Sequence, residues 1–456
     1  MNKIKNLALL TDLYELTMAA SYWEQGMNET AVFSLFVREY PPQRRYFVSC
    51  GLKEVLEYLS DLEFTQDDLE YLESTGFFKP DFLSFLENFR FRGDVHAMPA
   101  GTLFFEEEPV LEVKAPLIEA QIIETFLINA VNLQTMIATK ASRCVHAARE
   151  KKLVDFSFRR CQGIDAAMKV AKASYIAGFI GTSNVLAGKQ YGIPIYGTMA
   201  HSYVSSFDKE IDAFRAFSQT FPENSILLVD TYDSLSGTIK AAQVGEEMAD
   251  QGEKLKGIRL DSGDMVELSK KARKILDDHG LDQSMIFASG GFDEHKIQKV
   301  LSQKAEIDSF GVGTKMGVSA DAPYLDMAYK IAQYNEEPVL KLSTGKISLT
   351  SDKQVFRFSS DEGWYDHDVI ALREEKMEKG KPLLKPVMSS GKIIYEFPSL
   401  SEIQKQFKEN FSRLEKKHKD ILKDKPLYPV KISKKLQKLQ NKTIQKYKNK
   451  EILSSK

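Results

Sequence analysis

Four clusters of charged, hydroxyl or glycine residues each follow a short apolar run in the middle of the chain. They are Asp230–Asp233, Asp261–Asp264, Ser289–Asp293 and Gly311–Thr314. Carboxylates at such positions suit a divalent cation or sugar hydroxyls, and glycine-rich loops offer backbone N–H groups to a phosphate. Tight turns alone would explain any one loop, but four loops with the same polarity pattern favour a site for an anionic ligand.

Arginines stand beside two polar segments. Arg259 and Asp261 alternate along one expected strand and point to the same side, so a cation and a carboxylate meet at its end. Arg159 and Arg160 are adjacent in an otherwise apolar setting. Guanidinium groups offer paired donors to a carboxylate or phosphate, although an ion pair with a neighbouring acid would explain these two arginines equally well.

One of the seven histidines has a setting that suggests chemistry. His201 follows a short apolar run that breaks at Gly197-Thr198. A histidine beyond a strand end, beside small residues, can face a cavity and act as a base or nucleophile. A structural histidine is the alternative interpretation. Another polar loop, Gly181-Thr-Ser183-Asn184, lies between apolar segments.

The apolar runs before these clusters alternate with helical patterns. We expect strands at 225–229, 257–260, 285–288 and 307–310, and helices at 236–250, 265–278 and 293–303. This alternation predicts parallel strands joined by helices. A (β/α) barrel or an open α/β sheet builds its site at the carboxyl ends of such strands, where the clusters lie.

The segments on either side of this region differ from it. We expect helices at 12–23 and 52–62, a strand at 31–37, a long helix over 117–138 that Pro116 opens, and short strands at 338–342, 346–350 and 354–358. We predict an N-terminal α/β domain over 1–130, completed by 331–400. A catalytic domain would span 131–330, and a basic helical extension 401–456.

The extension carries a local charge of +11, whereas the first 400 residues carry −13. Ile403, Phe407, Phe411 and Leu414 keep helical spacing, which predicts an amphipathic helix. A solvated lysine face is favoured over a nucleic-acid patch.

The composition is that of a globular protein: 456 residues, 43% apolar and 28% charged, with a net charge of −2. Cys50, Cys144 and Cys161 give neither a disulfide framework nor a zinc spacing. The apolar stretch 7–10 is too short for a signal peptide, and no uncharged run approaches a membrane span. We therefore expect a soluble cytoplasmic protein.

Taken in order, these segments resemble the nicotinate phosphoribosyltransferase family over nearly the whole chain, from Thr11 to about Val430. The most specific pieces are Arg159–Gly163, Gly178–Gly188, Gly197–Ser202, Leu228–Asp233, Arg259–Asp264, Ala288–Gly291 and Gly311–Thr314. Cys161 and Ile164 replace the Ala and Pro more usual in the arginine motif. Gly317-Val-Ser-Ala320 stands where a Thr-Ser pair is usual.

The resemblance implies an irregular (β/α) barrel packed on an N-terminal α/β domain, and a homodimer with shared active sites. It implies the joining of nicotinate to phosphoribosyl diphosphate, with Mg²⁺ present and ATP hydrolysis coupled through a phosphohistidine. His201 would be that histidine. The sequence leaves the metal ligands unassigned.

The resemblance also implies roles for further residues. Nicotinate would be bound by Tyr14 of the neighbouring subunit, Arg159, Ser183, Thr198 and Arg259. The phosphoribosyl group would be bound by Arg160, Ser289, Gly290, Gly291, Gly313 and Thr314. Asp230 and Asp261 would stabilise positive charge on the ribose, and Asp261 would face the ribose or its Mg²⁺.

Ser183 bears on the choice of substrate. The related nicotinamide enzyme carries an acid in this loop, which would repel a carboxylate, whereas Ser183 can donate a hydrogen bond to one. Three alternatives stay open: a nicotinamide phosphoribosyltransferase, a barrel enzyme acting on a sugar phosphate, and a non-enzymatic binding protein.

Overall fold

A computed structural model describes residues 7–342, 348–421 and 426–449 of the chain. Its contacts divide the chain into two compact units. The terminal unit comprises Met1–Met136 and Tyr324–Lys456, and the central unit comprises Ile137–Pro323. The long helix α6 (Glu124–Ala148) runs from one into the other.

The terminal unit is built on a seven-stranded sheet in the order β13-β12-β1-β5-β3-β17-β18, whose described pairings are antiparallel. Its strands are β1 (Thr30–Val37), β3 (Asp94–Ala97), β5 (Leu111–Pro116), β12 (Met327–Tyr334), β13 (Glu337–Pro338), β17 (Lys385–Ser389) and β18 (Lys392–Ile393). A second sheet comprises β14 (Lys353–Ser359), β15 (Tyr365–Leu372), β16 (Lys381–Pro382) and β19 (Val430–Ile432), and a hairpin pairs β2 (Phe47–Val48) with β4 (Leu103–Phe104).

The helices of this unit are α1 (Leu13–Glu24), α2 (Leu52–Asp61), α3 (Gln66–Ser74), α4 (Pro80–Glu87), α5 (Leu117–Ile122), α15 (Leu400–Ser412), α16 (Lys416–Lys419) and α17 (Lys434–Tyr447). Ile403 and Phe407 of α15 are buried, as the amphipathic spacing predicts. The strand expected at 338–342 is wrong, since β13 ends at Pro338. The strand expected at 346–350 falls partly outside the described residues.

The single helix expected over 117–138 is also wrong. It divides into α5 and α6 around Ile123. The backbone N–H of Thr125 donates to the carboxylate of Glu15 at 2.9 Å instead of continuing the helical ladder. A carboxylate from another helix therefore replaces a backbone acceptor, and this ends the first helix.

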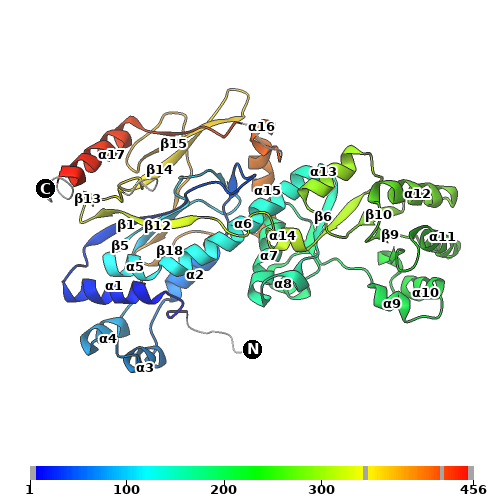
Figure 1. Cartoon of the computed structure of the whole chain (residues 1–456), viewed down its shortest axis with the longest axis horizontal. Helices are drawn as coiled ribbons and strands as arrows, with labels where there is room; N and C mark the ends of the chain where they lie inside the picture. Colours follow the sequence, from blue (N-terminus) through cyan, green and yellow to red (C-terminus); the bar gives the residue numbers. More distant parts are fainter. Residues whose placement is uncertain (1–6, 343–347, 422–425, 450–456) are drawn as a thin grey trace. The chain divides into compact units, whose positions relative to one another are not determined.

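The central unit is built on six parallel strands in the order β7-β6-β11-β10-β9-β8 (Figure 1). They are β6 (Lys152–Asp155), β7 (Gly181–Thr182), β8 (Ile226–Leu228), β9 (Gly257–Leu260), β10 (Met285–Ala288) and β11 (Ser309–Val312). The expected parallel strands are confirmed, with β11 beginning two residues later than expected. The described hydrogen-bonded pairings form a row that ends at β7 and β8.

Helices connect these strands. They are α7 (Ile164–Ile176), α8 (Val185–Tyr191), α9 (His201–Ser205), α10 (Glu210–Thr220), α11 (Ser234–Asp250), α12 (Met265–Asp278), α13 (Glu294–Ser302) and α14 (Thr314–Gly317), with a short 3-10 helix at Phe158–Arg160. Helices α10, α11 and α12 pack on one another in sequence.

Three of the four polar clusters end in an acid that caps a helix, and two of these three carry a second, earlier acid. Asp233, Asp264 and Asp293 each cap the helix that follows by accepting from its first backbone N–H groups. Asp230 and Asp261, earlier in their clusters, do not cap these helices. The last acid of each cluster therefore starts a helix, and the preceding residues are available for a ligand.

No described helix is both long enough and apolar enough to cross a membrane.

Candidate active site

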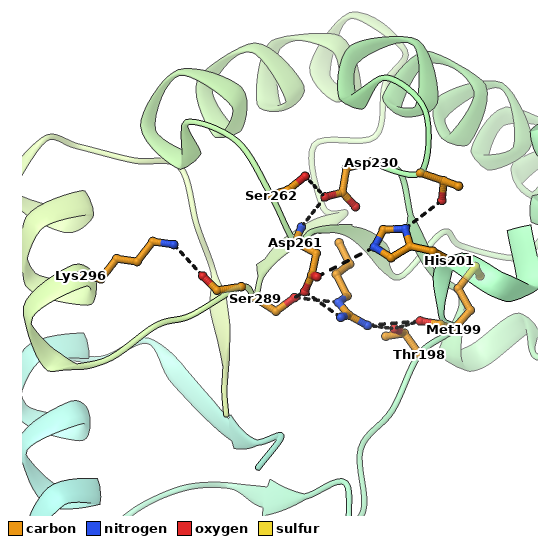
Figure 2. A network of polar contacts seen from close by, with 11 residues as sticks. Thr198, Met199, His201, Asp230, Asp261, Ser262, Ser289 and Lys296 are labelled. Atoms are coloured by element: carbon orange, nitrogen blue, oxygen red, sulfur yellow. Dashed lines mark hydrogen bonds and ion pairs between the residues drawn. The ribbon is translucent and has the colours of Figure 1, made fainter. Parts of the chain in front are cut away.

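Arg259, near the carboxyl end of β9, is the hub of a polar network. Figure 2 shows its partners Thr198, Met199, Asp261 and Ser289 gathered in one place. Its Nε donates to Ser289 Oγ at 2.8 Å, and its Nη2 lies 2.9 Å from Asp261 Oδ1. Its Nη1 donates to Thr198 Oγ1 at 3.0 Å and to the carbonyl of Met199 at 3.2 Å. One guanidinium thus joins three loops that are far apart in the sequence.

The Asp261 carboxylate is held in its charged form. It accepts hydrogen bonds from Ser289 and Arg259. Burial alone would raise its pKa, but these hydrogen bonds and the charge of Arg259 hold the pKa of Asp261 below its usual value. A carboxylate anion therefore stands at the centre of the site at neutral pH.

Asp230 fixes the loop that carries Asp261. Its Oδ2 accepts from the backbone N–H of Asp261 at 3.0 Å and from Ser262 Oγ at 2.6 Å. Its Oδ1 is buried and has no hydrogen-bond partner among the residues that the structure describes. A buried carboxylate oxygen without a partner is costly, so this atom is suited to a cation or a hydroxyl donor.

His201 is the first residue of α9 and faces the same network. Figure 2 shows His201 on one side of Asp261 and Lys296 on the other. Its Nδ1 lies 3.2 Å from Thr231 Oγ1, and its Nε2 lies 3.9 Å from Asp261 Oδ2. The side chain is 47% exposed. The imidazole is thus oriented by a hydroxyl and a carboxylate while remaining open to a ligand.

The two glycine-rich loops lie on adjacent strands, β10 and β11. Gly290 and Gly291 have φ values of +98° and +69°, in the left-handed region that favours glycine. Thr314 and the preceding Gly313 follow β11. Lys315 of that loop lies 2.8 Å from Asp293 of the other, so an ion pair ties the loops together.

A cavity of about 890 Å³ adjoins the network. Phe156, Ile195, Ile226 and Phe287 supply apolar walls, and Ser183 and Thr198 supply hydroxyl groups. The Phe156 ring also lies 5.6 Å from the Arg259 guanidinium. Glu150, Lys152, Lys256 and Asp308 also line the cavity, which therefore extends to the amino ends of the strands. Apolar walls with a few hydroxyl groups, as at the end beside Arg259, are typical of a site for a small ring-shaped ligand.

Another group of potential metal ligands lies apart from this network: Glu294, His295 and Asp321. The ammonium group of Lys140 lies 2.6 Å from Glu294 and 2.7 Å from Asp321. Arg143 also contacts Glu294 at 2.8 Å. The buried carboxylate is therefore neutralised by side chains of α6, which makes this group a structural ion-pair network.

Comparison with known proteins decides the family. The nicotinate phosphoribosyltransferase N-terminal domain matches residues 9–132, the nicotinate phosphoribosyltransferase family matches 151–355, and its C-terminal domain matches 378–440. A nicotinate phosphoribosyltransferase of Mycobacterium tuberculosis is 48% identical over 387 residues, which cover 85% of this chain and 83% of that protein. One of Bacillus subtilis is 37% identical over 462 residues and covers 94% of each.

The chain belongs to the nicotinate phosphoribosyltransferase family. Solved structures agree with its α/β fold. The crystal structure of human nicotinic acid phosphoribosyltransferase superposes with a TM-score of 0.85 at 27% identity, covering 95% of this chain and all of that one. The nicotinate-nucleotide pyrophosphorylase of Pyrococcus furiosus superposes with a TM-score of 0.75 at 26% identity, covering 91% and 97%.

The structure brings together most, but not all, of the residues expected from the resemblance to nicotinate phosphoribosyltransferases. Those that lie in or beside the network or the cavity are Ser183, Thr198, His201, Asp230, Arg259, Asp261, Ser289 and Gly290. Arg159 and Arg160 are exposed on the 3-10 helix, and within the described ranges neither guanidinium has a hydrogen-bond or ion-pair partner. Tyr14 belongs to the terminal unit and is 47% exposed.

Three residues of the candidate site were missed from the sequence. Thr231 lies inside a recognised motif, but nothing there shows that it reaches His201. Phe156 follows β6, and its alternation with Val154 along the chain is the signal that could have placed it in the cavity. Lys296 lies in an ordinary charged helical turn, which gives no signal.

Proposed function

We propose that this protein joins nicotinate to phosphoribosyl diphosphate, forming nicotinate mononucleotide and diphosphate in the salvage route to NAD, with ATP hydrolysis coupled to the reaction. The observation that carries this proposal is the Arg259 network beside an aromatic-walled cavity, in a chain of this family. The site offers a guanidinium group for the nicotinate carboxylate and carboxylates for the ribosyl cation. It also offers a glycine-rich loop edge for a phosphate.

Nicotinate would occupy the cavity with its ring against Phe156. The hydroxyl groups of Ser183 and Thr198 would donate to the nicotinate carboxylate, and Arg259 would supply the opposite charge. We also assign nicotinate contacts to Arg159 and to Tyr14 of the neighbouring subunit in a homodimer. Their exposure in one chain is compatible with a site that a second copy completes.

The phosphoribosyl group would lie along the edge formed by the loops after β9, β10 and β11. Its 5′-phosphate would accept from the backbone N–H groups of Gly290, Gly291, Gly313 and Thr314, with Ser289 and Arg160 nearby. The nicotinate ring nitrogen forms the new bond to C1′ as the bond from C1′ to the diphosphate oxygen breaks. Positive charge develops on the ribose in this step, and the carboxylates of Asp230 and Asp261 stabilise it.

The residues present fit Mg²⁺. The buried, unpartnered Oδ1 of Asp230 is an oxygen ligand of the kind that this ion prefers, and Asp261 lies beside it. When bound with phosphoribosyl diphosphate, the ion would neutralise charge on the departing diphosphate. Asp230 and Asp261 would hold it together with oxygens of the substrate.

His201 is our candidate for the phosphohistidine. An imidazole nitrogen would form a bond to the γ-phosphorus of ATP as the bond to the ADP oxygen breaks, and water would later hydrolyse the phosphohistidine. The added charge would lie beside Asp261, whose carboxylate is 3.9 Å from His201 Nε2. This proximity gives phosphorylation a direct electrostatic effect on the ribose site.

We also propose that the six central strands close into an irregular (β/α) barrel. Ile195, beyond β7, and Ile226, on β8, line the same cavity, although these strands end the hydrogen-bonded row. Side chains would then fill the gap between β7 and β8, where no backbone pairing is described.

The test is mononucleotide formation from phosphoribosyl diphosphate with nicotinate or nicotinamide, each with and without Mg-ATP. Wild type and His201→Ala are compared. We expect ATP-stimulated turnover of nicotinate alone, with the stimulation lost in the variant. Turnover of nicotinamide instead would assign the protein to the amide-using enzymes. No turnover of either substrate would reject the proposal.

A further inference from the structure

Two lysines that the reaction scheme above does not use lie beside the glycine-rich loops. Lys296 is on α13, after the β10 loop, and Lys315 is on α14, after the β11 loop. Lys315 Nζ contacts Asp293 Oδ2 at 2.8 Å. Lys296 Nζ donates to the carbonyl of Gly290 at 2.6 Å. Both ammonium groups therefore approach one short loop.

The positive charge of Lys296 lacks a direct counterion. In the described part of the chain no carboxylate lies within ion-pair distance of its Nζ, which contacts a neutral carbonyl and lies 4.5 Å from the centre of the Phe292 ring. Burial and the charge of Lys315 lower the pKa of Lys296. A partly buried ammonium close to a second ammonium is suited to an anionic ligand.

Two carboxylates, Asp293 and Asp261, act on the charge of Lys296 from beyond ion-pair distance, and both already have partners. Asp293 Oδ1 accepts from the backbone N–H of Lys296 to cap α13, and Oδ2 accepts from Lys315. Both oxygens are therefore committed to contacts that hold the two loops in place. Lys296 is therefore left with a neutral carbonyl as its hydrogen-bond acceptor, and its charge remains open to a ligand anion.

The glycine-rich loop after β10 has free space beside Gly291 but none beside Gly290. A Cβ atom at Gly290 would lie 1.9 Å from the carbonyl oxygen of Asp261, whereas a Cβ at Gly291 would meet no described atom within 4 Å. Figure 2 shows Lys296 reaching this loop from the side opposite to His201. The open side of Gly291 is therefore where a ligand could meet loop amides and lysines together.

We propose that Lys296 and Lys315 bind the 5′-phosphate of phosphoribosyl diphosphate from the outer side of the glycine-rich loops. This inference rests on the proposed function, since it assigns one group of its substrate. The 5′-phosphate is favoured over the diphosphate because Asp230 and Asp261, the candidate Mg²⁺ ligands, lie on the other side of the loop. On binding, Lys296 exchanges its carbonyl acceptor for a phosphate oxygen.

The experiment measures binding by calorimetry, in the full-length protein without nicotinate or turnover. The probes are ribose 5-phosphate, which carries only the 5′-phosphate, and inorganic diphosphate with Mg²⁺. The variants are Lys296→Met and Lys315→Met. Lys299→Met is the matched control because Lys299 is exposed on the same helix, and its ammonium group makes no hydrogen bond or ion pair with the described residues.

We expect each Met variant to weaken ribose 5-phosphate binding roughly tenfold or more, as for the loss of a charged hydrogen bond. Diphosphate binding and Lys299→Met should match wild type. Lys296→Arg and Lys315→Arg keep the charge and should recover part of the affinity, which separates a binding role from misfolding.

Unchanged ribose 5-phosphate binding in both Met variants would overturn the lysine assignment and leave the proposed function intact. A loss confined to diphosphate would overturn the choice of phosphate. If wild type binds neither ribose 5-phosphate nor phosphoribosyl diphosphate, the proposed function and this inference both fail.

Discussion

The Cα atom of Gly290 faces the backbone carbonyl of Asp261 so closely that a Cβ atom at position 290 would lie 1.9 Å from the carbonyl oxygen. The loop after β10 therefore packs directly against the loop after β9, with no room for a side chain. This contact sets the separation between the glycine-rich edge and the Asp261 carboxylate.

Replacing the two loop glycines should have unequal effects. Gly291→Ala should lower the free energy of unfolding by only about 1–2 kcal/mol, the cost of a left-handed backbone conformation. Gly290→Ala adds a steric clash and should cost more, with a larger loss of phosphoribosyl diphosphate binding. Urea unfolding and calorimetry measure both effects, and equal losses in the two variants would contradict the packing argument.

Ser183→Asp should shift substrate preference from nicotinate toward nicotinamide. A carboxylate in the cavity wall repels the nicotinate carboxylate and can accept from the amide NH₂. The ratio of kcat/KM for the two substrates measures the change. Ser183→Ala is the control because it removes the donor without adding charge. An unchanged ratio in Ser183→Asp would remove Ser183 from the specificity argument.

Arg259→Met should raise the pKa of Asp261, because the variant loses both a hydrogen bond and a positive charge at that carboxylate. The acid limb of the kcat/KM profile should therefore move to higher pH. Activity should also fall roughly 100-fold, as for removal of a donor aimed at developing charge. Arg259→Lys should restore part of the pH shift. A fall in activity with an unmoved acid limb would show that Arg259 does not control Asp261.

Glu15 should make the stability of the chain pH-dependent. Burial raises its pKa to about 7, although hydrogen bonds from Thr11 and Thr125 oppose the increase. Between its ordinary pKa and about 7, the unfolded chain loses the proton while the folded chain keeps it. The free energy of unfolding should therefore fall by up to about 3 kcal/mol as pH rises through this range.

Glu15→Gln should abolish that fall, because its amide is neutral at every pH and occupies the same space. Urea unfolding at pH 5 and pH 8 compares this variant with wild type. Glu73→Gln, at an exposed position of α3, is the control and should behave as wild type. A wild-type stability that does not fall with pH would refute the role of Glu15.

The elements around the site could be predicted because each has a local pattern. Met265–Asp278 and the strands β9 and β10 match the expected ranges, since apolar runs and helical spacing depend on neighbouring residues alone. The break at Ile123 could not be predicted. It arises from a hydrogen bond between Thr125 and Glu15, which are 110 residues apart.

The contacts of the site also divide into those that follow from neighbouring residues and those that depend on the folded chain. Arg259 and Asp261 could be paired because strand alternation places them on one side. The contact of Arg259 with Thr198 joins residues 61 positions apart and depends on the folded sheet. Lys296 escaped notice because its neighbours give it the pattern of a solvent-facing helical residue, and only the β10 loop brings it to Gly290.

The order of strands in the central sheet has a consequence for synthesis on the ribosome. Strand β6 lies between β7 and β11, and Ser309 of β11 bonds to Lys152 of β6 across 157 residues of chain. At about 5–20 residues per second, roughly 8–30 s separate the appearance of these two strands. During that interval one edge of β6 has no strand to pair with. The nascent chain is then most exposed to aggregation, and chaperones would have most to protect.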